Sequence, residues 1–235
     1  MLMAEVIKVI GKNAFVQVFE STRGMRVGDE AEFEGHMLEV TLGPGMLSRN
    51  YDGLQNDLDK MEGVFLRRGE YTFPLDNDKL WDFKPLAKVG DKVAAGGWLG
   101  EVDENFQPHK IMVPFTFKGE YTVKSLKEAG QYTIGEVIAV LTDETGKDVE
   151  VTMIQRWPVK RAITCYKEKP RPYKLLETGV RTIDTVNPIV EGGTGFIPGP
   201  FGTGKTVLQH AISKQAEADI VIIAACGERA NEVVE

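Results

Sequence analysis

The residues most clearly suited to chemistry form a glycine-rich loop, GPFGTGKT, at positions 199–206. This spacing is that of a P-loop, whose glycines let the backbone turn tightly and aim its N–H groups at phosphate. Lys205 is expected to reach the β- and γ-phosphates, and the hydroxyl of Thr206 to ligate Mg²⁺. The loop therefore predicts a site for a nucleoside triphosphate, with ATP as the expected ligand. The residues predicted to contact it are Gly199, Pro200, Phe201, Gly202, Thr203, Gly204, Lys205, Thr206 and Val207.

A second pair of reactive side chains, Glu228 and Arg229, follows the apolar run at 219–226. Ligands of open parallel sheets bind at the carboxyl ends of the strands, where a P-loop also lies. A carboxylate at this edge can orient the water that attacks the γ-phosphate. The residues alone leave a second interpretation open, in which Glu228 and Arg229 are an exposed ion pair at the start of a helix.

The elements expected to position these groups are those of an α/β nucleotide-binding domain. We expect a short helix at 178–184, a brief strand at 194–197, a helix at 205–218 with one apolar side, and a strand at 219–226. The last segment is continuously apolar, which is typical of a strand buried on both faces of a parallel sheet. Strand, loop, helix and strand are the opening of such a domain.

The chain before this domain is rich in predicted β-strands. Segments 4–10, 14–19, 26–33 and 36–45 indicate a small β-barrel or sandwich whose first strands are expected to be missing. Segment 133–157 predicts a hairpin pair with a polar tip at 143–146.

The glycine-punctuated stretch 88–102 is similar to the half-repeats of lipoyl- and biotinyl-carrier barrels, which present a modified lysine at a hairpin tip. Lys110 is the nearest candidate, but its flanking residues do not match the carrier motif. We therefore favour a structural insert without a modified lysine.

Composition excludes several classes of function. The chain has 235 residues, a net charge of −7 and a sequence pI of about 5.2. This acidic balance disfavours a nucleic-acid-binding protein, which would present clustered Lys and Arg. The two cysteines, Cys165 and Cys226, give neither a disulfide scaffold nor a metal-binding spacing, and they suit a reducing cytoplasm. The N-terminus does not have the pattern of a signal peptide, and no apolar stretch is long enough to span a bilayer.

Three pieces in order carry a resemblance to a known family: TGVRTID at 178–184, GGTGFIPGPFGTGKTVLQHA at 192–211 and ADIVIIAACGERANEV at 218–233. Together they resemble the catalytic A subunit of V-type and archaeal-type rotary ATPases. Upstream, FVQVFESTRGMRVGD, LGPGMLSRNYDGLQ and WPVKRA also resemble that subunit. The resemblance covers nearly the whole chain, and the combination of motifs is far more specific than the P-loop alone.

The resemblance implies a multidomain chain of β and α/β parts. We expect an incomplete N-terminal β-barrel at 1–65, a β-sandwich insert, or bulge, at 66–160, and the first part of a RecA-like P-loop domain at 161–235. Pro158 begins a basic, proline-broken linker between the last two.

The resemblance also implies a function. The A subunit alternates with a non-catalytic B subunit in a hexameric ring, where ATP hydrolysis turns a central stalk and drives H⁺ or Na⁺ through a membrane sector, or ATP is made in reverse. Peripheral stalk subunits, ATP or ADP, and Mg²⁺ are the implied partners and cofactors. Carried onto this chain, Lys205, Glu228 and Arg229 are the catalytic residues, and Thr206 is the Mg²⁺ ligand. An arginine finger comes in trans from B, and the subunit is cytoplasmic and meets the membrane only indirectly.

The chain departs from the family pattern at both ends, so we expect a piece of a larger subunit that cannot turn over ATP by itself. Other RecA-like motors remain as alternatives: an F-type β subunit, a secretion ATPase or a Rho-like translocase. The β-rich insert disfavours all three. A non-catalytic nucleotide-binding subunit or assembly module is the other alternative, and Glu228 counts against the former.

Overall fold

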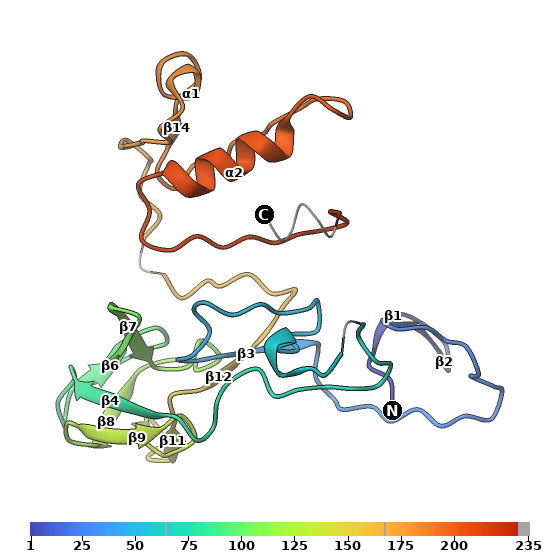
Figure 1. Cartoon of the computed structure of the whole chain (residues 1–235). Coiled ribbons are helices and arrows are strands. Elements are labelled where there is room, and N and C mark those ends of the chain that lie inside the picture. Colours follow the sequence, from blue (N-terminus) through green and yellow to red (C-terminus); the bar gives the residue numbers. More distant parts are fainter. Residues whose placement is uncertain (64, 167, 230–235) are drawn as a thin grey trace. The chain divides into compact units, whose positions relative to one another are not determined.

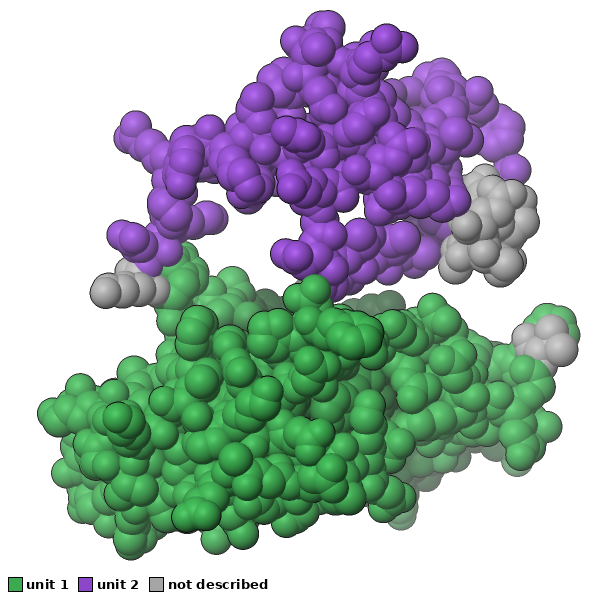
Figure 2. Space-filling model, turned by 60° about the vertical axis from the view of Figure 1, so that its left-hand side comes forward, with its two compact units in different colours: residues 1–166 green, residues 167–235 purple. Residues whose placement is uncertain are grey.

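The computed structural model describes residues 1–63, 65–166 and 168–229, and the chain divides into unit 1, residues 1–166, and unit 2, residues 167–235 (Figure 2). The described part of unit 1 consists of strands and one 3₁₀ turn, whereas both described α-helices lie in unit 2 (Figure 1). The first strands are β1 Ala4–Ile10, β2 Asn13–Val18, β3 Glu39–Leu42, β4 Leu80–Pro85, β5 Lys92–Val93 and β6 Trp98–Glu104, with the 3₁₀ turn η1 at Leu58–Lys60. They are followed by β7 Gln107–Met112, β8 Tyr121–Leu126, β9 Gly130–Thr133, β10 Ala139–Asp143, β11 Asp148–Val151 and β12 Gln155–Pro158. Unit 2 holds β13 Leu175–Leu176, α1 Arg181–Val186, β14 Ile189–Val190 and α2 Lys205–Gln215.

Unit 1 contains two four-stranded antiparallel sheets, in the orders β7-β6-β4-β9 and β11-β10-β8-β5. Alternation along the strands determines which side chains face inward, because successive residues of a strand point to opposite faces. In β4, for example, Trp81 and Phe83 are buried while their neighbours are exposed. The prediction of a β-rich insert is confirmed here, including the β10–β11 hairpin, whose polar tip is closed by bonds from Thr145 and Lys147 to Asp143.

Two clusters of buried apolar side chains are formed by these sheets and the loops next to them, and Leu126 packs against both. Burying a large aliphatic or aromatic side chain contributes about 1.5–3 kcal/mol, so the clusters account for much of the stability of this region. The first cluster contains Leu75, Trp81, Phe83, Val102, Ile111, Ile134, Ile138 and Met153. The second contains Leu99, Val113, Val123, Ala139, Leu141 and Val151.

Strand β3 is separated in sequence from its partner by the whole of the two sheets. It pairs with β12, with Leu42 opposite Gln155 and Glu39 opposite Pro158. This ladder returns the chain to where it entered the sheets. Trp157 of β12 is 7% exposed, and its indole N–H donates to the carbonyl of Arg161 at 2.7 Å.

A buried carboxylate, Glu104, joins the end of β6 to the loop that comes after β3. Its Oε1 accepts hydrogen bonds from the amides of Gly45 at 2.7 Å and Leu47 at 2.9 Å, and its Oε2 lies 2.7 Å from Nδ1 of His109. Burial raises the pKa of Glu104, but the bonds to His109, Leu47 and Gly45 outweigh it and hold that pKa below its ordinary value. The ionised carboxylate is therefore the form that fits the fold.

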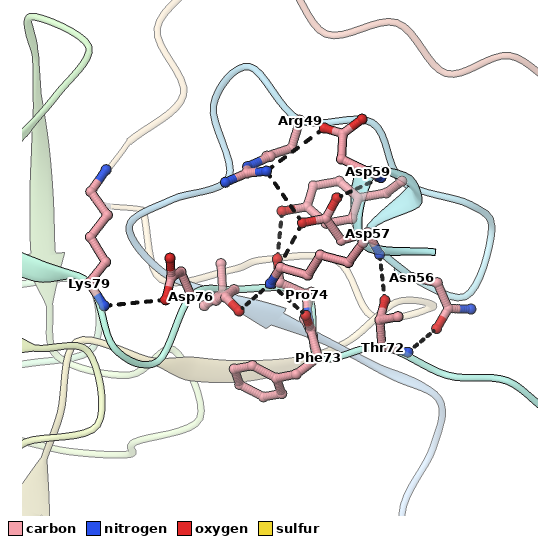
Figure 3. A network of polar contacts seen from close by, with 12 residues as sticks. Arg49, Asn56, Asp57, Asp59, Thr72, Phe73, Pro74, Asp76 and Lys79 are labelled. Carbon is pink, nitrogen blue, oxygen red and sulfur yellow. Dashed lines mark hydrogen bonds and ion pairs between the residues drawn. The ribbon is translucent and has the colours of Figure 1, made fainter. Parts of the chain in front are cut away.

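A polar network, not regular secondary structure, organises residues 49–79 (Figure 3). At its centre Asp57 is 0% exposed, and its Oδ2 lies 3.7 Å from both Arg49 Nη1 and Lys60 Nζ. The amide of Asp57 donates to the hydroxyl of Thr72 at 2.8 Å, and the amide of Thr72 donates to Asn56 Oδ1 at 2.8 Å. These bonds join residues before and after position 65. The domain boundary predicted at that position stays a prediction.

The strands predicted at 4–10 and 14–19 are confirmed as the hairpin of β1 and β2. Strands β1 and β2 pair across a tight turn whose Gly11 has φ 57°, a left-handed conformation that glycine adopts without strain. The strand expected at 26–33 was wrong: those residues form turns and irregular backbone, mostly exposed. They have no neighbouring strand to pair with in the described chain, and an isolated extended segment leaves its backbone groups without partners.

The turn between β6 and β7 differs from the carrier pattern. Its two central residues, Asn105 and Phe106, both have left-handed backbones, with φ 53° and 66°. Lys110 does not lie at this tip. It lies within β7, opposite Glu101 and paired with it, and its ammonium is 5.0 Å from the centre of the Trp98 ring. A lysine held in this way is not presented for modification.

The predictions of strands on either side of the P-loop, at 194–197 and 219–226, were wrong. Residues 194–197 are irregular, and so are residues 219–226, where Ile222 is 88% and Ile223 71% exposed. A strand of a parallel sheet needs partner strands and cover on both faces, and the described residues of unit 2 provide neither. The short helix after residue 178 is confirmed as α1, and the helix at Lys205 is confirmed as α2, which ends at Gln215 rather than at 218.

Gly100 lies opposite Pro85 in the ladder between β4 and β6, and the packing there requires a glycine. A Cβ added at Gly100 would overlap the ring of Phe83 and lie 2.8 Å from the carbonyl oxygen of Lys84. Gly100→Ala should therefore lower the free energy of unfolding of unit 1 by about 1–3 kcal/mol. Gly135→Ala is the matched control, because nothing lies within 4 Å of the added methyl group. Denaturant unfolding of both variants checks this, and equal midpoints would contradict it.

The Glu104 contacts predict a dependence of stability on pH. Because the folded pKa of Glu104 lies below the ordinary 4.5, its stabilisation is complete above that pH and is lost as the pH falls further through the folded value. Glu104→Gln should destabilise the protein at pH 7 and flatten the loss of stability below pH 4.5. Urea unfolding between pH 3 and pH 7 measures this, with exposed Glu150→Gln as the control. Parallel curves for wild type and Glu104→Gln would refute it.

Candidate functional site

The P-loop leads directly into helix α2, whose first residue is Lys205. Gly202 and Gly204 both have φ 80°, a left-handed conformation that is costly for residues with a side chain. Gly204 occupies the N-cap position, and no side chain accepts a hydrogen bond from the first amides of α2. These N–H groups and the positive end of the helix dipole are therefore available to an anion.

The ammonium of Lys205 folds back over the loop. Its Nζ donates to the carbonyls of Gly199 at 2.7 Å and Pro200 at 2.8 Å, and the hydroxyl of Thr203 donates to the same Pro200 carbonyl at 2.8 Å. The Lys205 ammonium thus links the start of α2 to the first residues of the loop. A bound phosphate can replace these carbonyls as the partner of Lys205, because charge-assisted bonds are stronger than bonds to a neutral carbonyl.

The remaining residues predicted for the loop lie at or near the protein surface. Thr206 is half-buried, and its hydroxyl makes no hydrogen bond to another described residue. Phe201 is 82% and Val207 72% exposed. No group of three or more His, Cys, Asp or Glu side chains suited to a metal ion is found in the described parts of the chain.

A cation–π contact links the Cys-Gly-Glu-Arg segment to the P-loop. The guanidinium of Arg229 lies 4.8 Å from the centre of the Phe201 ring, a cation–π arrangement. Glu228 is exposed and makes no hydrogen bond or ion pair with another described residue. Cys226 is exposed, so its expected place in a buried strand was wrong. Residues 230–233, the end of the third motif, lie outside the described residues.

The sequence pattern did not reveal the role of Asp184. Its Oδ1 accepts from the Thr178 hydroxyl at 2.7 Å and the Thr178 amide at 3.0 Å, and its Oδ2 accepts from the Gly179 amide at 3.1 Å. The signal was present as a Thr-Gly pair followed at a fixed distance by Asp, which is typical of a side chain that caps its own turn.

The backbone on each side of Thr178 contacts the C-terminal end of α2. The amide of Glu217 donates to the carbonyl of Glu177 at 3.0 Å. Gly179, with φ 73°, packs so closely that an added Cβ would lie 2.9 Å from Gln215 Oε1. The P-loop and this turn thus lie at opposite ends of one helix.

Comparison with known proteins assigns the chain to a class. It belongs to the ATP synthase alpha/beta family, three of whose domain models match it in order. The beta-barrel domain matches residues 1–35, the alpha/beta subunit barrel-sandwich domain matches residues 72–160, and the nucleotide-binding domain matches residues 179–235. The predicted order of barrel, β-rich insert and P-loop domain is confirmed.

Individual relatives narrow this class. The chain is 52% identical over 237 residues to a V-type ATP synthase alpha chain of Treponema denticola, covering 100% of this chain and 40% of that one. It is 48% identical over 237 residues to a V-type ATP synthase alpha chain of Protochlamydia amoebophila, with 100% and 40% covered. The chain thus spans 40% of the length of these relatives. Among the described residues, no helix has the length and apolar character needed to cross a bilayer.

Proposed function

We propose that this chain carries the P-loop of the catalytic subunit of a V-type rotary ATPase. In that complex, ATP hydrolysis drives rotation and H⁺ or Na⁺ transport, or rotation drives ATP synthesis. The observation that carries the proposal is the P-loop itself, with Gly202 and Gly204 left-handed and Lys205 opening an uncapped helix. Its relatives, named V-type ATP synthase alpha chains, support the same assignment.

Binding of the nucleotide follows from the loop geometry. The phosphates accept hydrogen bonds from the loop amides and the first turn of α2, and Lys205 moves from the Gly199 and Pro200 carbonyls to the β- and γ-phosphates. Thr206 offers its hydroxyl to Mg²⁺, which neutralises charge on the phosphates when bound. Exposed Phe201 is available to cover the nucleotide from the loop side.

Hydrolysis requires a group that orients water. We assign this role to Glu228, with Arg229 beside it in the site. The contact between Arg229 and Phe201 supports the assignment, because it ties the Glu228 segment to the P-loop. The neighbouring non-catalytic B subunit supplies an arginine finger in trans, which raises the rate by about 10³ or more. The separate chain is accordingly a poor ATPase.

The wider assembly follows from the same assignment. The subunit alternates with B in a hexameric ring and works with central and peripheral stalk subunits. It lies on the cytoplasmic side and meets the membrane only through the ion-translocating sector. It binds no nucleic acid, in line with its net charge of −7. We also propose the domain limits 1–65, 66–160 and 161–235, the second holding both four-stranded sheets and the third α1 and α2.

Another RecA-like motor or a non-catalytic assembly module fits less well. The match of residues 72–160 to a barrel-sandwich domain and the names of the relatives favour the V-type alpha chain over an F-type β subunit, a secretion ATPase or a Rho-like protein. Glu228 favours a catalytic over a non-catalytic site.

The P-loop assignment predicts a specific loss of nucleotide binding. Lys205→Ala removes the cation at the loop and should weaken Mg·ATP binding by about 100-fold or more, since charged hydrogen bonds to phosphate are lost. Lys214→Ala is the matched control, because Lys214 carries the same charge in the last turn of α2. Isothermal titration of the chain with Mg·ATP measures both variants. Equal affinities would remove Lys205 from the site.

The assignment of Glu228 predicts a split between binding and turnover. In the assembled complex, Glu228→Gln should retain Mg·ATP affinity and lose at least about 100-fold in hydrolysis rate, because the amide cannot take up a proton from water. Glu217→Gln, an exposed carboxylate just after α2, is the control. Near-normal turnover in Glu228→Gln would exclude this residue as the catalytic carboxylate.

A further inference from the structure

Helix α2 is held mainly at its ends. None of its residues is fully buried, although Leu208, Ala211 and Ile212 are half-buried on one side. Such a helix gains little from apolar burial, so hydrogen bonds at its ends carry much of its positional stability. Its N-terminal end is the P-loop, and its C-terminal end contacts the turn at residues 177–180.

That turn is shaped by one carboxylate. Thr178 is 0% exposed, and its hydroxyl both donates to Asp184 Oδ1 and accepts from the amide of Val180 at 3.2 Å. With the amide of Gly179 on its other oxygen, Asp184 has both oxygens occupied. The turn therefore keeps its shape only while Asp184 accepts from both sides.

The same turn presents two contacts to α2. The Glu177 carbonyl accepts from the amide of Glu217, and Gly179 packs against Gln215. A change of backbone angle at residues 178–180 moves both contacts together, because they lie on either side of the buried Thr178. The end of α2 thus follows the shape of the turn.

We propose that Asp184 is a positioning residue for the phosphate-binding loop, acting through Thr178 and Gly179 on the C-terminal end of α2. This inference rests on the proposed function of the P-loop. A helix is stiff along its axis, so a shift at Gln215 is carried to Gly204 and Lys205 at the other end. In this proposal, Asp184 acts only through the turn and the helix, not by contacting the nucleotide.

The titration of Asp184 is consistent with this role. Donation by the Thr178 hydroxyl, followed by the Thr178 and Gly179 amides, holds the pKa of Asp184 below its ordinary value. The ionised form is therefore the one that shapes the turn at neutral pH, and its contribution is lost only on acidification below the ordinary 3.8.

The decisive variant is Asp184→Asn in the full chain. Asparagine keeps one acceptor oxygen but places an NH₂ group against either the Thr178 hydroxyl side or the Gly179 amide, so one bond becomes a clash between donors. We expect about tenfold weaker Mg·ATP binding and faster amide hydrogen exchange along residues 208–216. Glu191→Gln is the control, because it removes an equal charge from unit 2 and breaks only the exposed pair with Lys174.

A second pair of variants tests the same link if Asp184→Asn does not fold. Thr178→Val removes the hydroxyl at constant shape, whereas Thr178→Ser retains it. Weaker binding and faster exchange in α2 for valine but not for serine support the inference, and equal behaviour of the two overturns it. Wild-type affinity together with unchanged α2 exchange in Asp184→Asn also overturns it.

Failure of the proposed function is distinguishable from failure of this inference. If neither wild type nor Lys205→Ala binds Mg·ATP, the P-loop assignment fails, and the exchange measurement alone decides on Asp184. Faster exchange in α2 of Asp184→Asn then still assigns it the positioning of the helix, and unchanged exchange rejects that role.

Discussion

The backbone of a phosphate-binding loop has to leave its N–H groups free for the ligand, so the loop cannot stabilise itself with them. Its shape must come from other groups in and around the loop. Here it comes from α2, from the left-handed glycines before it, and from the Lys205 ammonium, which bonds to two loop carbonyls. The turn at residues 177–180 helps to hold that helix at its other end. With Asp184, this turn satisfies its own backbone and contacts the helix end at once.

The two units are stabilised in different ways. Unit 1 combines two clusters of fully buried apolar side chains with buried carboxylates, Glu104 and Asp57, that join its irregular segments. In unit 2 the described helices contain no fully buried residue. Among the described residues of this unit, Thr178 is the one that is fully buried. Sites that bind and release ligands are drawn from the less stable parts of proteins, since they have to rearrange. Unit 1 suits a scaffold, and unit 2 suits a moving part.

The sequence was most informative where one residue type has one physical use. Glycine and lysine spacing located the P-loop, and the polar residues at 143–146 located the tip of the β10–β11 hairpin. It failed at 26–33 and 219–226, where apolar or β-branched residues predict strands but a strand also needs a partner that composition cannot supply. It missed Glu104 and Asp184 as well, because a carboxylate that caps backbone amides looks like any surface acid until the fold brings those amides to it.

The ladder between β3 and β12 has a consequence for how the protein is made. On the ribosome, residues 39–42 emerge long before residues 155–158, their only strand partner in the described chain. At about 5–20 residues per second, the wait is on the order of ten seconds. The sheets between them are complete by β11 and can fold during this time, so β12 meets a scaffold that is already in place. The last ladder therefore closes the unit, and β3 is the segment most in need of protection on the nascent chain.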